Sequence, residues 1–175
     1  MKKNLFAWAS IGENGKAVGG IRGDQTGKEV KVGNYYNFGQ NIVIRFRDIE
    51  KGRMLGKIAK FIANSNIVGY NQNDRVTFYL ECQKRRWNWK RIKADIKKGK
   101  FPPCNTDCSA FVAACINIVM SMKVVSCFTT GTMYHNCIEK NGALFKSFLI
   151  DKMDSIGWRK GDMPLKAYKH VIINV

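Results

Sequence analysis

The stretch NTDCSAFVAAC, residues 105–115, marks the point where a polar turn becomes an apolar helical run. It opens a pattern of apolar side chains at helical spacing, made up of Phe111, Val112, Cys115, Ile116 and Val119. The pattern predicts a buried helix over 108–120. A thiol in the first turn of such a helix lies at the positive end of the helix dipole, beside free backbone N–H groups. Cys108 is therefore a candidate nucleophile, and the alternative is that it fills the core as a small apolar residue.

A cysteine nucleophile needs a general base, and the chain has two histidines. His170 opens the run HVIINV, which predicts a strand whose first side chain can project toward a packed helix. His135 lies within an expected short helix beside Cys137, where it is harder to aim at Cys108. A helix N-terminal cysteine facing a later strand histidine is the papain-like arrangement, so His170 is the expected base.

The first 50 residues are expected to be rich in β-structure. WASI, ENGK and AVGGI predict a hairpin, because Asn14-Gly15 favours a tight turn between apolar stretches. NIVIRFRD, residues 41–48, predicts a further strand, since β-branched and aromatic residues alternate with arginines.

The middle of the chain predicts two helices before the candidate nucleophile. Residues 52–63 carry apolar side chains at helical spacing with lysines outside. Residues 74–83 predict a second helix, with Val76, Tyr79 and Leu80 on one side. At the end of the chain, one strand is expected to begin near Asp162, and HVIINV is expected to be a central strand. Together these elements predict one α+β domain over 1–175, in which the buried helix packs on an antiparallel sheet.

The chain is strongly basic, with a formal net charge of +17. This charge favours anionic surroundings: nucleic acid, an anionic membrane face or an anionic cell-wall polymer. The run KRRWNWKRIKADIKKGK, residues 84–100, interleaves tryptophans with cations and would also suit nucleic acid. The rest of the chain stays basic without it, which fits an anionic wall at least as well.

Six cysteines in a chain of this length, with no visible export signal, are expected to be reduced thiols. A zinc site is an alternative, and its ligands would be Cys104, Cys108, His135 and Cys137. The spacing is loose for such a site, and the Pro-Pro pair before Cys104 does not suit a zinc knuckle. No metal and no organic cofactor is therefore expected.

The start of the chain, MKKNLFAWASIGENG, is basic, but its apolar run is too short for the core of a signal peptide. No segment reaches the roughly 18 to 20 apolar residues of a membrane span. We expect a protein made in the cytoplasm that reaches any wall substrate only after release.

Three segments in order resemble the NlpC/P60 superfamily of cysteine peptidases and amidases: TDCSAFV (106–112), GDMPL (161–165) and KHVIINV (169–175). The segment WASIGENGKAVGGIRGDQTGKEV resembles the start of phage and prophage members of that group. The resemblance implies a papain-like fold with Cys108 as nucleophile and His170 as base. It also implies a phage or prophage lytic enzyme, similar to endolysins, that hydrolyses an amide bond of peptidoglycan. Both an endopeptidase and an N-acetylmuramoyl-L-alanine amidase fit.

Two further roles follow from the comparison with papain-like enzymes. Asp24 and Gln25 are candidates for contacts with substrate or with the oxyanion. A third polar residue usually orients the histidine, yet Asn174 lies four residues along the strand, roughly 13 Å away, and is not expected to reach the ring. A basic nucleic-acid-binding module, with or without zinc, and a degenerate hydrolase that only binds the wall are the alternative functions.

Overall fold

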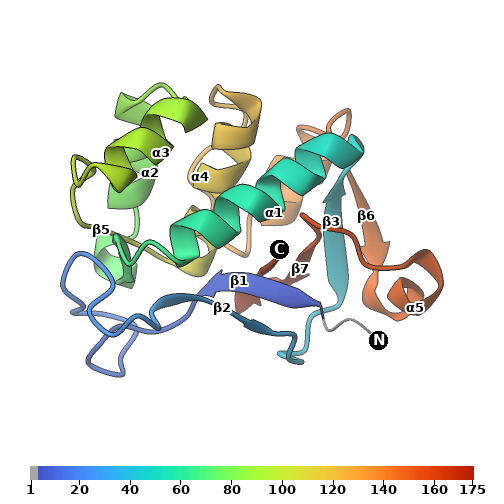
Figure 1. The fold of residues 1–175 in the computed structure, drawn as a ribbon. Helices are drawn as coiled ribbons and strands as arrows, with labels where there is room; N and C mark the ends of the chain where they lie inside the picture. The colour runs from blue at the N-terminus through green and yellow to red at the C-terminus, as the bar shows by residue number, and fades with distance from the viewer. Residues whose placement is uncertain (1–3) are drawn as a thin grey trace.

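The computed structural model describes residues 4–175 and has a mixed α+β architecture with antiparallel sheets (Figure 1). The strands are β1 (Leu5–Ala9), β2 (Val30–Asn34), β3 (Ile42–Phe46), β4 (Val68–Tyr70), β5 (Cys104–Thr106), β6 (Phe145–Leu149), β7 (Met163–Lys166), β8 (His170–Val171) and β9 (Ile173–Asn174). The helices are α1 (Ile49–Ala63), α2 (Thr77–Lys84), α3 (Trp89–Lys97), α4 (Cys108–Met120) and α5 (Met153–Ile156), with short helical turns η1 (Gln72–Asp74), η2 (His135–Glu139) and η3 (Ile150–Lys152).

Helix α4 forms the centre of the core and has the bounds predicted from its apolar pattern. Its residues are buried from Cys108 to Ile118. It packs between α1 and α2, with β1 and β8 against it as well (Figure 1). Because the helix is covered on all these sides, nearly every residue along it must be apolar or small.

Helix α1 confirms the helix predicted over 52–63 but begins earlier, at Ile49. The side chain of Asp48 accepts hydrogen bonds from the backbone N–H groups of Glu50 and Lys51, at 2.8 and 3.2 Å. This N-cap satisfies donors that the helix itself leaves free, which explains the earlier start. Close packing against the end of the chain depends on Gly56, where a Cβ would lie 2.9 Å from the carbonyl oxygen of Asn174.

The predicted N-terminal hairpin is wrong, although its tight turn exists. Gly15 has a φ of 71° and donates its N–H to the carbonyl of Gly12. Beyond the turn, however, the segment AVGGI does not pair with β1; β1 pairs instead with β2, across the loop 10–29. The carboxylate of Asp24 accepts backbone N–H groups from this loop and closes it, so β2 rather than the nearer segment reaches β1.

The end of the chain crosses between two antiparallel sheets. One sheet has the strand order β6-β3-β7-β8 and the other has the order β2-β1-β9, while β4 and β5 form a separate parallel pair. The prediction of HVIINV as one central strand is wrong, because β8 and β9 are both edge strands, of different sheets. Between them, Ile172 donates its N–H to the carbonyl of Pro164 at 3.3 Å. The predicted strands over 41–48 and after Asp162 are confirmed as β3 and β7.

A buried ion pair fixes β7 against β3. The guanidinium of Arg45 donates to both carboxylate oxygens of Asp162, at 2.6 and 2.7 Å, and the two residues are 3% and 0% exposed. The backbone carbonyl of Asp162 also accepts the N–H of Asn174 at 2.8 Å. The Gly-Asp pair of the segment GDMPL therefore has a structural role here, since it joins three strands.

The second predicted helix is confirmed as α2, and of the apolar side noted in the sequence only Tyr79 is buried. Val76 and Leu80 are exposed, whereas Phe78 and Cys82 are fully buried beside Tyr79. The hydroxyl of Tyr79 donates to the carbonyl of Val125 at 2.8 Å, which holds this side of α2 toward α4. No helix within residues 4–175 is long and apolar enough to cross a membrane.

Candidate active site

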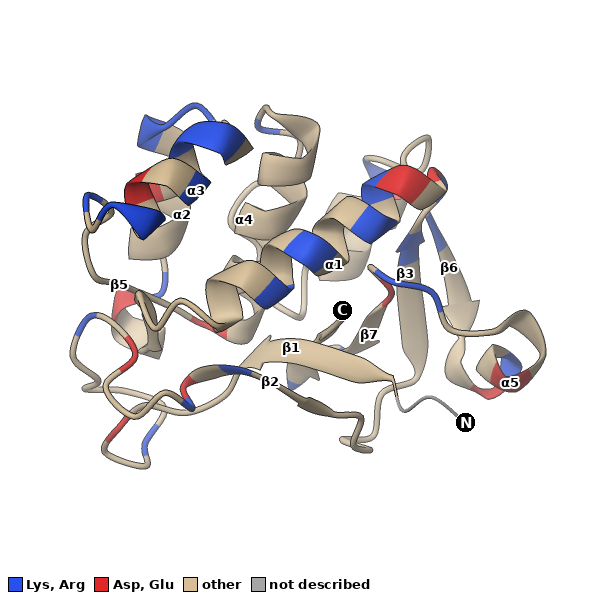
Figure 2. Cartoon of the chain, viewed as in Figure 1, with Lys and Arg blue, Asp and Glu red and all other residues tan. Residues whose placement is uncertain are grey.

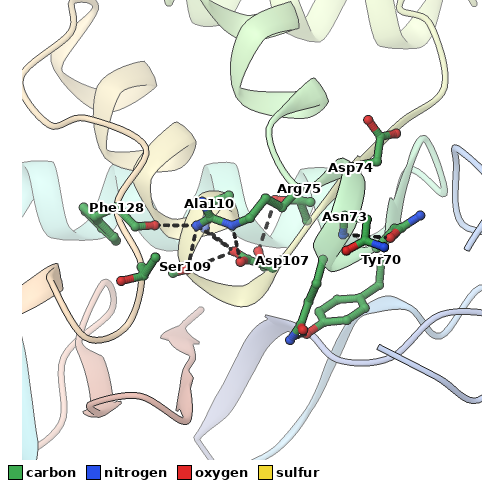
Figure 3. A network of polar contacts seen from close by, with 12 residues as sticks. Tyr70, Asn73, Asp74, Arg75, Asp107, Ser109, Ala110 and Phe128 are labelled. Carbon is green, nitrogen blue, oxygen red and sulfur yellow. Dashed lines mark hydrogen bonds and ion pairs between the residues drawn. The ribbon is translucent and has the colours of Figure 1, made fainter. Parts of the chain in front are cut away.

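The start of α4 is held by a network of polar contacts. Asp107 is its N-cap, and its carboxylate accepts the N–H of Ala110 at 2.6 Å and the hydroxyl of Ser109 at 2.9 Å. Arg75 forms an ion pair with the same carboxylate. Its guanidinium also donates to the hydroxyl of Ser109 at 3.1 Å and to the carbonyl of Phe128 at 2.5 Å (Figure 3). The residue before Cys108 is thus fixed from several sides.

Cys108 lies at the first turn of α4 and is 7% exposed. Burial raises the pKa of its thiol to about 12, and the negative charge of Asp107 acts in the same direction. Hydrogen bonding by the backbone N–H groups of Val171, Ser109 and Cys108 itself lowers this pKa, but by less. The thiol is therefore neutral near pH 7 in the resting protein, and it lies against strand β8 at Val171.

His170 is the first residue of β8, and β8 packs against α4, which begins with Cys108. Within residues 4–175, Nε2 of His170 makes no hydrogen bond to the Cys108 thiol. The imidazole is half-buried, and its ring centroid lies 5.2 Å from that of Phe38 and 6.3 Å from that of Tyr36. Burial lowers the pKa of His170 to about 4, against the opposite effect of the Asp107 carboxylate. At neutral pH the ring is uncharged and can accept a proton.

The ring has no orienting partner on one side. Within residues 4–175, Nε2 of His170 is buried without a hydrogen-bond partner. Asn174 belongs to β9 in the other sheet, where it pairs with Phe6. The aromatic rings of Tyr36 and Phe38 pack around the imidazole in place of a polar group.

Two tyrosines beside Cys108 were not singled out from the sequence. Burial raises the pKa of Tyr36, and the charge of an ionised Cys108 raises it further. The pKa of Tyr70 is raised to about 12 by the same two causes in the same order. The hydroxyl of Tyr70 accepts a hydrogen bond from Gln72 at 3.1 Å. Both tyrosines, like Arg75, come from segments far from residue 108 in the sequence. The aromatic cluster YYNF at 35–38 was the local feature that could have drawn attention to Tyr36.

Asp24 and Gln25 shape the loop that they belong to. The carboxylate of Asp24 accepts N–H groups from Thr26, Lys28, Glu29 and Val30, at 3.1 to 3.3 Å. The side-chain amide of Gln25 donates to the carbonyls of Arg22 and Gly23, at 3.0 and 3.2 Å. Their predicted contacts with substrate or oxyanion stay a prediction, because the side-chain hydrogen bonds of both residues, within the described part of the chain, go to residues 22–30.

The four residues of the alternative zinc site do not come together. Within residues 4–175, no group of three or more His, Cys, Asp and Glu side chains is arranged to hold a metal ion. His135 instead pairs with Glu139 on the surface, at 2.5 Å from Nδ1, while Cys137 is fully buried. All six cysteines are unpaired thiols in this part of the chain.

Comparison with known proteins gives one match. A family model described as "Endolysin-like domain" matches residues 6–175, which is nearly the whole chain. The search of curated proteins and the search of solved structures each gave no match.

Proposed function

The chain belongs to the endolysin-like domain family, and from this premise we propose that it is a phage or prophage lytic enzyme whose thiol cleaves an amide bond of bacterial peptidoglycan. The observation that carries the cysteine mechanism is the packing of α4, which opens with Cys108, against β8, which opens with His170. The membership by itself supports a lytic enzyme that acts on the cell wall; the cysteine chemistry and the amide bond are the finer part of the proposal.

The proposal includes a papain-like fold of the NlpC/P60 kind, with residues 1–175 as one catalytic domain. Its support is the order of elements: a cysteine that opens a buried helix, followed by the antiparallel strands β7 and β8, of which the second opens with histidine. The unpartnered Nε2 of His170 is a departure from the usual triad. The absence of an orienting group lowers the rate of catalysis but does not abolish it, since the nucleophile, the base and the oxyanion donors remain.

In the proposed reaction, Sγ of Cys108 attacks the carbonyl carbon of the substrate amide while its proton passes to the neutral imidazole of His170. The oxyanion receives hydrogen bonds from free N–H groups at the start of α4. The imidazolium then donates its proton to the leaving nitrogen, the C–N bond breaks, and a thioester remains. Water, deprotonated by His170, hydrolyses the thioester and restores the thiol.

The electrostatics indicate that the thiolate forms only during the attack. The pKa of Cys108 is raised to about 12 by burial and that of His170 is lowered to about 4 by burial, so the two groups rest as a neutral pair. Proton transfer becomes favourable only when the negative charge moves on to the substrate oxygen, where the helix N-terminus stabilises it. Arg75 assists by neutralising Asp107, whose charge opposes thiolate formation.

The test compares the wild type with Cys108→Ser and Cys115→Ser on purified Gram-positive cell walls. The loss of turbidity of the wall suspension measures hydrolysis. Cys115 is a matched control, because it is a fully buried thiol on the same helix and has no role in the proposed reaction. We expect the wild type and Cys115→Ser to clear the walls and Cys108→Ser to leave them intact. Clearing by Cys108→Ser at the wild-type rate would refute the thiol mechanism. Mass spectrometry of the released fragments identifies the bond as a stem-peptide bond or the sugar–peptide amide.

An anionic wall polymer is the second partner in this proposal, and the basic helix α3 with its flanks is the surface that would meet it (Figure 2). The exposed cations of residues 84–100 are Lys84, Arg86, Lys90, Arg91, Lys97, Lys98 and Lys100. Stacking of bases, the argument for nucleic acid, needs exposed aromatic rings, and the two tryptophans of this run are packed against the protein instead. Trp87 is 4% exposed and Trp89 packs edge-on against Phe61 with centroids 5.3 Å apart. Binding to walls that falls with salt and with extraction of teichoic acid is expected; equal binding to extracted walls would argue against this partner.

A further inference from the structure

A layer of aromatic rings covers one face of the β2-β1-β9 sheet and begins at the candidate base. Phe6 and Trp8, two residues apart on β1, point to the same side and pack with Phe38, Ile172 and Trp158. The ring of Tyr36 lies 5.3 Å from that of Trp8. Since Phe38 and Tyr36 also contact the His170 ring, the layer is continuous with the candidate active site.

The other end of the layer is hollowed. A cavity of about 300 Å³ lies there, lined by Asn4, Phe6, Asn34, Tyr35 and Trp158. The ring centroid of Tyr35 lies 5.2 Å from that of Phe6 and 5.4 Å from that of Trp158. Tyr35 is 37% exposed while Phe6 is fully buried, so Tyr35 presents part of its ring to the cavity.

Gln40 holds the wall of this cavity in place. Gln40 is 7% exposed; its amide nitrogen donates to the hydroxyl of Tyr35, and its amide oxygen accepts the N–H of Phe38 at 2.9 Å. One buried amide thus ties together both ends of the segment 35–38, whose two tyrosines face the cavity and the candidate active site respectively.

We propose that this cavity binds an uncharged N-acetylated sugar ring of the glycan strand. The faces of the Tyr35 and Trp158 rings suit the apolar C–H face of a sugar, because aromatic faces carry partial negative charge. The amides of Asn4 and Asn34 can donate to and accept from hydroxyl and acetamido groups. The lining residues within 4–175 carry no formal charge although the chain is strongly basic, which disfavours the carboxylates of stem peptides and the phosphates of wall polymers.

The inference rests on the proposed function, because a glycan subsite matters to catalysis only if the bond cut belongs to peptidoglycan. The cavity and the candidate active site lie at the two ends of the same aromatic layer. Phe6 lines the cavity and Trp8 packs with Tyr36, and the two residues are about 7 Å apart along β1 at strand rise. Tyr35 and Tyr36 are consecutive. Substrates that retain their glycan are therefore favoured over free stem peptides.

The direct test is binding of the trisaccharide of N-acetylglucosamine to the Cys108→Ala protein. Calorimetry and two-dimensional NMR measure the binding. Tyr35→Ala and Asn34→Ala are expected to weaken binding at least about tenfold. Tyr168→Ala, which removes an 88% exposed tyrosine outside the cavity, is the matched control and should bind as its parent does. Circular dichroism checks that each variant is folded. No binding at millimolar trisaccharide, or equal binding by the Tyr35 and Asn34 variants, would overturn the assignment, as would displacement of the sugar by a free stem peptide.

A second measurement separates failure of the subsite from failure of the proposed function. Hydrolysis by the wild type and by Tyr35→Ala is compared on glycan-bearing fragments and on free stem peptides. A rise in KM of about tenfold for Tyr35→Ala, confined to the glycan-bearing fragments, supports the subsite. If the wild type hydrolyses neither substrate while the trisaccharide still binds through Tyr35, the proposed function fails and the sugar site stands. If hydrolysis depends on Cys108 but is unaffected by Tyr35→Ala and no sugar binds, the sugar site fails alone.

Discussion

Arg75 and Asp107 form an ion pair beneath the first turn of α4, and the charge of Asp107 acts on the pKa of both Cys108 and His170. It opposes ionisation of the thiol and favours protonation of the imidazole. Arg75 is the group that balances this charge, through contacts with Asp107 and Ser109 (Figure 3). A residue from the segment before α2 is thus paired with the carboxylate whose charge acts on two groups, one on α4 and one on β8.

Replacement of Arg75 by methionine leaves the largely buried carboxylate of Asp107 without its partner. We expect a loss of roughly 2 kcal/mol in the free energy of unfolding, measured by urea denaturation at pH 7, together with loss of wall hydrolysis. Arg22→Met is the control, because Arg22 pairs with Asp74 on the surface and such pairs contribute roughly 1 kcal/mol or less. Equal stability losses in the two variants would show that the Arg75 network is not special.

His170 makes the folded protein sensitive to acid. Its pKa is lowered to about 4 by burial, whereas in the unfolded chain a histidine titrates near 6.5. Below pH 6.5 the unfolded state binds a proton that the folded state does not, so stability falls as the pH is lowered toward 4. The contribution of this one group is roughly 3 kcal/mol across that window. Urea unfolding at several pH values should show it.

His170→Phe is expected to remove this part of the pH dependence, since phenylalanine can pack against Phe38 and Tyr36 without titrating. His135→Gln, which changes the surface histidine paired with Glu139, should retain it. If the free energy of unfolding of His170→Phe still falls between pH 6.5 and 4 as steeply as that of the wild type, the acid sensitivity belongs to the carboxylates instead.

The resting thiol of Cys108 should react slowly with alkylating reagents. A pKa of about 12, raised mainly by burial, leaves far less thiolate at pH 7 than an ordinary cysteine has. Labelling of Cys108 by iodoacetamide, read by peptide mass spectrometry, should be roughly a thousandfold slower than labelling of free cysteine and should rise with pH beyond 9. Fast labelling at pH 7 that disappears in His170→Phe would instead indicate a resting thiolate–imidazolium pair.

Asp162 should matter for stability rather than for chemistry. In Asp162→Asn the guanidinium of Arg45 stays buried without a counter-charge, which typically costs about 3 to 5 kcal/mol. The double variant Arg45→Met/Asp162→Leu removes both charges and should unfold at a higher urea concentration than Asp162→Asn. If Asp162→Asn keeps full stability yet loses wall hydrolysis, Asp162 has a direct catalytic role.

The sequence by itself determined the elements whose signals are local. Helix α4 starts at Cys108 because Asp107 caps it and an apolar pattern follows, and both signals lie within a few residues of each other. Strand β3 and most of α1 were predictable for the same reason. The candidate pair Cys108 and His170 came from local context together with their order along the chain.

Only the tertiary structure decided how distant segments pair. The partner of β1, the division of the last strand between two sheets and the buried face of α2 depend on which surfaces meet, and no short segment carries that information. The same holds for Arg75, Tyr36 and Tyr70, which gather near Cys108 from other parts of the chain. Burial in this assembled core, and not residue type, lowers the pKa of His170 and raises that of Cys108, because desolvation depends on every neighbour that excludes water.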